Sequence, residues 1–81
     1  MSDVETAVME FLAEIPTDRP ITRDTELMEQ GILDSTALVR LILFLESRFR
    51  ILIDDSEIAP ESFASVAAIT AFVQRKRAAA A

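Results

Sequence analysis

The amino-acid sequence predicts an all-α fold, a small four-helix bundle with three principal helices, one short helix and a long loop between the first two. Apolar residues recur at helical spacing in three segments of the chain. Each of these segments begins beside a serine or an aspartate, the residues that best cap a helix start. The one strand-like run, residues 51–53, has no second run to pair with, and an isolated strand is not a stable unit.

The first helix is predicted to begin at about Asp3 and to end before Pro16. Ser2 and Glu5 have the spacing of a capping box, in which the two side chains satisfy free backbone N–H groups. Six apolar residues share one face of this helix: Val4, Ala7, Val8, Phe11, Leu12 and Ile15.

Residues 16–33 form a long connection without a sustained period. Within it, residues 25–30 can form one helical turn that ends at Gly31. Loops longer than about 12 to 15 residues are uncommon in compact domains and are often functional. The length of this connection therefore indicates that it shapes a site.

The second helix is predicted to begin at Asp34 or Ser35, since both are good N-caps, and to run to about Phe49. At 100° per residue, its core-facing residues are Leu38, Leu41, Ile42, Leu45 and Phe49. The opposite face holds Thr36, Arg40, Leu43 and Ser47, with Phe44 on a flank. Leu43 lies farthest from the core, so the pattern predicts a large apolar side chain in solvent.

Beyond the second helix, residues 51–53 are predicted to be an extended apolar connector. Pro60 suits the first position of a short helical turn through Phe63, because its missing N–H is not needed there. Ser65 is expected to cap a last helix in which four residues face inward and Phe72 lies on the boundary. The inward residues are Val66, Ile69, Thr70 and Val73. We expect one domain over residues 1–77 and a frayed tail over residues 78–81.

The composition excludes several classes of chemistry. A chain of 81 residues forms one small domain without room for a deep substrate cleft. The sequence contains no histidine and no cysteine, which removes the usual general base, the thiolate nucleophile and the thiolate metal site. A single glycine cannot build a phosphate-cradling loop. We therefore expect neither an enzyme nor a metal site.

The charge is acidic and unevenly distributed. The net charge is -6, and residues 1–34 hold nine acids against two bases. Such a chain is a poor ligand for nucleic acid and a good one for partners with basic patches. It also has neither a signal peptide pattern nor an apolar run long enough to span a membrane. We expect a cytoplasmic monomer that binds no membrane.

A serine stands at the junction of the long connection and the second helix, in the segment Gly31-Ile32-Leu33-Asp34-Ser35-Thr36. With no base to activate it, Ser35 cannot be a hydrolytic nucleophile by itself. A phosphate placed on its hydroxyl would lie at the positive end of the helix dipole, so the site suits modification by another enzyme. The alternative is that Asp34 and Ser35 only cap the helix.

A wider ordered pattern surrounds this serine. Its segments are Asp24-Thr25-Glu26-Leu27, Gly31-Ile32-Leu33-Asp34-Ser35, Leu38, Leu41 to Glu46, Phe49, Ile53-Asp54-Asp55-Ser56-Glu57-Ile58, Pro60-Glu61-Ser62-Phe63, Ser65, Ile69 and Phe72-Val73. This ordered set closely resembles the acyl carrier protein and peptidyl carrier protein family. The resemblance covers about residues 3–75, nearly the whole chain.

The resemblance implies a phosphopantetheine site. In this family the serine of the Asp-Ser motif, here Ser35, receives 4'-phosphopantetheine from coenzyme A through a magnesium-dependent phosphopantetheinyl transferase. The thiol of that group then holds an acyl or aminoacyl group as a thioester, which would explain the missing cysteine. Asp34 would position Ser35 at the transferase rather than act as a base.

The resemblance also implies partner enzymes and a surface that docks them. The partners would be the transferase, a ligase or transferase that loads the arm, and downstream synthase, condensing or tailoring enzymes. The docking surface would be the second helix and the end of the preceding loop. Its candidates are Leu33, Thr36, Arg40, Leu43, Phe44 and Ser47.

Two departures from the family pattern bear on the pathway. Thr36 follows the serine where leucine is common, and the predicted second helix has a single acid, Glu46, where fatty-acid carriers are rich in acids. These features favour a discrete carrier in a natural-product pathway, of polyketide or nonribosomal peptide type, over housekeeping fatty acid synthesis. The alternative is an unmodified carrier-fold interaction module or regulatory subunit.

Overall fold

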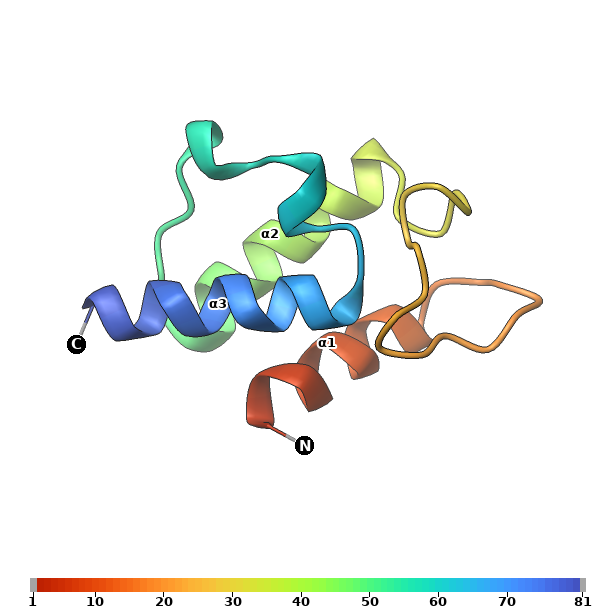
Figure 1. Cartoon of the computed structure of the whole chain (residues 1–81), viewed down its shortest axis with the longest axis horizontal. Helices are drawn as coiled ribbons and strands as arrows, with labels where there is room; N and C mark the ends of the chain where they lie inside the picture. The colour runs from red at the N-terminus through yellow and green to blue at the C-terminus, as the bar shows by residue number, and fades with distance from the viewer. Residues whose placement is uncertain (1, 81) are drawn as a thin grey trace.

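A computed structural model describes residues 2–80 as a bundle of three α-helices and two short 3₁₀ helices, without a β-strand in that range. The elements are α1 (Asp3–Ala13), α2 (Ser35–Phe49), η1 (Asp55–Glu57), η2 (Pro60–Ser62) and α3 (Val66–Ala80). Helix α3 crosses α2 and also lies against α1 (Figure 1). The predicted all-α class is confirmed, and no helix within residues 2–80 has the length and apolarity that a membrane span needs.

Helix α1 begins as the sequence predicts and ends slightly earlier. Ser2 caps it by accepting a hydrogen bond from the N–H of Glu5, with an Oγ to N distance of 3.0 Å. The helix ends at Ala13, and the N–H of Ile15 bonds back to Leu12. Because the residue before a proline avoids helical dihedrals, Pro16 ends the helix upstream of itself.

The connection between α1 and α2 is part of the hydrophobic core. Leu27 is completely buried, and Ile32 and Leu33 are 8% and 2% exposed. The remaining core residues come mainly from the inward faces of the three α-helices and from Phe63. A segment that sequence alone presents as a loop therefore carries a share of the apolar burial that stabilises the domain.

Backbone hydrogen bonds hold this connection against the start of α3. The N–H of Leu27 donates to Ala64 over 2.8 Å, and the N–H of Ala67 donates to Arg23 over 2.9 Å. The predicted helical turn is present, since the N–H of Gln30 donates to Glu26, four residues earlier. Gly31 follows with a φ of 71°, the left-handed conformation in which glycine carries no steric penalty.

The segment after α2 is the extended connector that the sequence predicts. Ile51 and Ile53 are buried while Leu52 between them is 83% exposed, as alternation along an extended chain requires. The N–H of Ile53 donates to the Glu46 carboxylate over 2.9 Å. The short helix η1 that follows was not expected from the sequence, whereas η2 begins at Pro60 as predicted.

Helix α3 follows the sequence prediction on its inner face. Ser65 Oγ accepts a hydrogen bond from the N–H of Ala68 over 3.1 Å, which is the expected cap. All four residues expected to face inward are buried. Phe72, expected at the boundary, is only 5% exposed, because its ring packs on Phe63 with centroids 5.3 Å apart.

Two basic residues join α3 to the rest of the bundle. Arg77 lies 3.2 Å from the Asp3 carboxylate, and its guanidinium covers the Phe49 ring at 5.3 Å, so it links all three helices. Lys76 donates to Glu57 over 2.8 Å, and this hydrogen bond lowers the pKa of the Glu57 carboxyl. The helix extends to Ala80 and residue 81 lies outside the described range, so the fraying expected over residues 78–81 stays a prediction.

Replacing Phe63 with alanine should lower the free energy of unfolding by about 3 to 5 kcal/mol, because it removes a completely buried ring. That loss is comparable to the whole stability of a small domain. Urea denaturation followed by circular dichroism measures it. Leu52→Ala is the matched control, since an exposed side chain should change the stability by no more than about 0.5 kcal/mol. Similar losses in both variants would contradict the burial pattern.

Thr70→Val should raise the free energy of unfolding by about 1 kcal/mol. Thr70 is 7% exposed, and within residues 2–80 its hydroxyl has no hydrogen-bond partner, so valine keeps the shape and removes a desolvated polar group. The same urea experiment measures the gain. Thr70→Ser is the control, because it keeps the hydroxyl, loses the methyl group and should be destabilising. A valine variant less stable than its parent would refute this assignment.

Candidate functional site

The start of α2 separates two roles that the sequence leaves open between Asp34 and Ser35. Asp34 is the N-cap: its backbone is extended, and its carboxylate accepts a hydrogen bond from the N–H of Ala37 over 2.8 Å. Ser35 is the first helical residue and is exposed. Within residues 2–80 its hydroxyl has no hydrogen-bond partner. The capping is therefore done by Asp34, and the serine oxygen is free to react.

The preceding loop holds this junction in place and corrects one sequence prediction. After the left-handed turn at Gly31, the N–H of Leu33 donates to Leu27 over 3.0 Å, and both side chains enter the core. Leu33 was predicted to contribute to a docking surface. With only 2% of it exposed, its side chain belongs to the core and is not part of the surface.

The outer face of α2 is exposed as its periodicity predicts. Thr36, Arg40 and Ser47 are exposed, and Leu43 exposes 59% of its surface. The sequence prediction missed Val39, which is 56% exposed. Its place four residues before Leu43 could have revealed it, because residues at that spacing share a helix face.

Phe44 differs from the other candidates on α2, because its side chain is only partly exposed. Its ring packs against Phe11 of α1 with centroids 5.3 Å apart. An aromatic pair at this separation stabilises the contact beyond its buried area. Phe44 therefore joins α1 to α2 and is only partly available at the surface.

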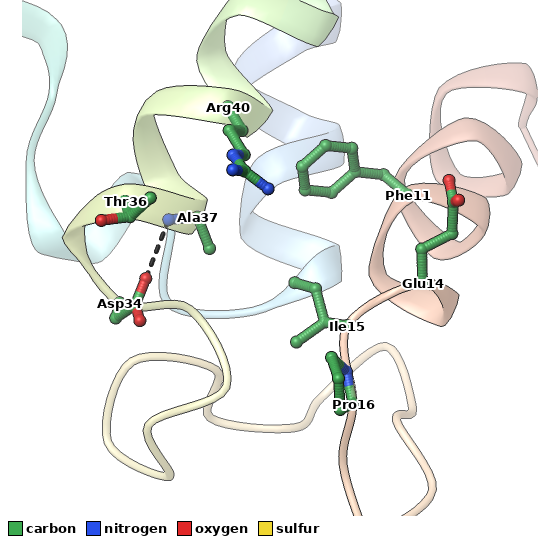
Figure 2. A pocket seen from close by; sticks show the side chains of 8 residues that line it. All are labelled: Phe11, Glu14, Ile15, Pro16, Asp34, Thr36, Ala37 and Arg40. Carbon is green, nitrogen blue, oxygen red and sulfur yellow. Dashed lines mark hydrogen bonds between the residues drawn. The ribbon is translucent and has the colours of Figure 1, made fainter.

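A groove lies between the end of α1 and the first turns of α2 (Figure 2). Its volume is about 480 Å³, and it is lined by Phe11, Glu14, Ile15, Pro16, Asp34, Thr36, Ala37 and Arg40. A second hollow of about 430 Å³ is lined by Ser35, Thr36, Val39 and Arg40. Because Thr36 and Arg40 line both, the serine stands beside the groove.

The acidic charge is concentrated away from α2. Glu26 and Glu29 lie close together on the connection, and their hydrogen bond and mutual repulsion raise the pKa of Glu26 above its ordinary value. Glu26 and Glu29 line a hollow together with Glu61, which belongs to η2. The one acid of α2, Glu46, accepts the hydrogen bond from Ile53. Electrostatic attraction of basic partners would therefore come from α1, the connection and the segment after α2 rather than from α2 itself.

The structure is a small helical bundle in which an exposed serine follows the aspartate cap of α2. No model of a known protein family matches the chain. The sequence is 39% identical over 57 residues to the D-alanyl carrier protein of Bacillus subtilis (strain 168), an alignment that covers 68% of this chain and 73% of that relative. This chain therefore belongs to the carrier protein family that its sequence resembles.

Asp34→Ala should lower the free energy of unfolding by about 1 kcal/mol, because the carboxylate that caps α2 is lost. Thermal and urea unfolding measure the change. Asp34→Asn is the matched control: it keeps a capping oxygen and should stay within a few tenths of a kcal/mol of the parent. Equal stability of the alanine variant and its parent would show that Asp34 does not cap the helix in solution.

Proposed function

We propose that this protein carries an aminoacyl group as a thioester on 4'-phosphopantetheine attached to Ser35. In the attachment step, Ser35 Oγ attacks the phosphorus atom that bears the pantetheine in coenzyme A. The bond from that phosphorus to adenosine 3',5'-bisphosphate breaks, and a base of the transferase takes the serine proton. The thiol of the attached group supplies the thioester bond. Catalysis belongs to the partner enzymes.

The free Ser35 hydroxyl at the exposed start of α2 is the observation that supports this proposal. The first N–H groups of a helix have no partner within the helix, and they favour an anion placed there. Arg40 lines the same hollow as Ser35 and adds a positive charge. The Asp34 carboxylate accepts a hydrogen bond from the N–H of Ala37, so it stabilises the helix start and makes no hydrogen bond with the Ser35 hydroxyl.

The cargo class follows from the relative. Its name specifies a D-alanyl group, so we infer an aminoacyl cargo for this chain, loaded by an adenylating ligase. The preference for a natural-product pathway has only Thr36 and the low acidity of α2 to support it, whereas the aminoacyl cargo has a matching relative.

We further infer that the outer face of α2 docks the partner enzymes. Thr36, Arg40 and Ser47 offer polar contacts around the exposed Leu43, and Phe44 adds a partly exposed ring. A large apolar side chain within a polar rim is the usual arrangement of an interface anchor. Val39 extends the apolar part of this face toward Ser35.

Incubating the protein with coenzyme A and a broad-specificity phosphopantetheinyl transferase should add one phosphopantetheine group, because the Ser35 hydroxyl is exposed and unpaired. Intact-mass spectrometry measures the addition. Ser35→Ala should abolish it, whereas Ser47→Ala, at another exposed serine of α2, should leave it unchanged. An unmodified parent, or modification that survives in Ser35→Ala, would instead support the unmodified interaction module.

Leu43→Ala should slow aminoacyl transfer between the carrier and its ligase by roughly fivefold or more, the effect of losing an anchor worth above about 1 kcal/mol. Arg40→Glu should also slow transfer. Stopped-flow or quenched-flow transfer assays measure both, and circular dichroism checks that the bundle remains folded. Leu52→Ala, an exposed leucine outside α2, is the control. Unchanged transfer in both α2 variants would place the docking surface elsewhere.

A further inference from the structure

The groove between α1 and α2 contains two opposite charges that no residue of the described chain neutralises. Arg40 comes from α2 and Glu14 from the end of α1, and Figure 2 shows both at the groove beside the Phe11 ring. Within residues 2–80 neither side chain has an ion pair or a hydrogen bond. Other charged residues on the surface, such as Asp3 and Arg77, pair with each other.

The lining of the groove is apolar between these charges. Phe11, Ile15 and Ala37 contribute carbon surface from both helices. Thr36 and Arg40 line both this groove and the hollow of Ser35, so the groove adjoins the serine. A ligand attached to Ser35 would therefore meet a cation first, then an apolar surface, and an anion on the far wall.

We propose that this groove is the resting site of the phosphopantetheine arm when it carries an aminoacyl group. The inference rests on the proposed function and adds a recognition site to it. Arg40 pairs with the phosphodiester, which is anionic, and Glu14 accepts hydrogen bonds from the α-ammonium group of the cargo. The apolar lining covers the dimethyl carbon portion of the arm.

The order of charges distinguishes an aminoacyl arm from a simple acyl arm. Both have the phosphodiester, but only the aminoacyl arm has a cation at its far end to match Glu14. The Asp34 carboxylate also lines the groove, yet it is engaged with the N–H of Ala37. Exposed ion pairs are weak, so the arm would leave the groove readily when a partner enzyme binds it.

Nuclear magnetic resonance of the loaded carrier tests this proposal. A broad-specificity transferase would attach either an alanyl arm or a propionyl arm to Ser35, with a hydrolysis-resistant link in place of the thioester. We expect contacts between the alanyl arm and the Phe11 ring and Ile15 methyl groups, measured as nuclear Overhauser effects. The propionyl arm lacks only the ammonium group, and its bound population should be about twofold to fivefold lower.

Two charge variants and their controls test whether Glu14 binds the ammonium group and Arg40 binds the phosphodiester. Glu14→Gln should lower the bound population of the alanyl arm to that of the propionyl arm, whereas Glu10→Gln, on the same helix but outside the groove, should not. Arg40→Gln should weaken the contacts of both arms and shift the phosphorus resonance, whereas Arg48→Gln should do neither. No partner enzyme is present in these samples, so a docking defect cannot produce the loss.

Intact mass separates failure of this inference from failure of the proposed function. If no arm can be attached to Ser35, the carrier function itself fails. If the arm is attached but contacts no groove residue, or contacts another face of the bundle, the resting site is refuted and the carrier function stands. Equal contacts from the alanyl and propionyl arms would refute recognition of the ammonium group by Glu14.

Discussion

The position of the candidate site depends on the anchoring of residues 14–34 in the core. This connection would be free to move if it were held only at its ends. Instead, the buried Leu27 and its backbone hydrogen bond to Ala64 join its middle to the start of α3. The bond from Leu33 back to Leu27 then places the start of α2. The apolar side chains of a segment without regular structure thus fix the position of Ser35.

At the start of α2, the capping contact and the exposed hydroxyl belong to neighbouring residues. Had Ser35 capped the helix, its oxygen would accept a backbone N–H and would be less available to a transferase. Asp34 accepts that hydrogen bond instead, and Ser35 stays exposed at the positive end of the helix. The Asp-Ser pair therefore combines a capped helix start with an exposed hydroxyl.

The sequence prediction succeeded where local patterns decide the structure and failed where distant residues decide it. Helical spacing placed Leu43 in solvent correctly, because the angle between residues on one helix is set by the backbone. Leu33 was wrongly assigned to the surface, because its burial depends on Leu27 and on a turn at Gly31. The burial of Phe72 was underestimated for a similar reason, since it depends on Phe63 from another element.

The sequence by itself determined the helical class, the approximate helix bounds, the family resemblance and the choice of Ser35. All of these depend on residue types and spacings along a single segment or on their order in the chain. Only the tertiary structure decided that Asp34 alone caps α2, which backbone groups hold the connection, and that Arg40 and Glu14 line one groove. These features bring together residues from different elements, and the packing of those elements is what sets their distances.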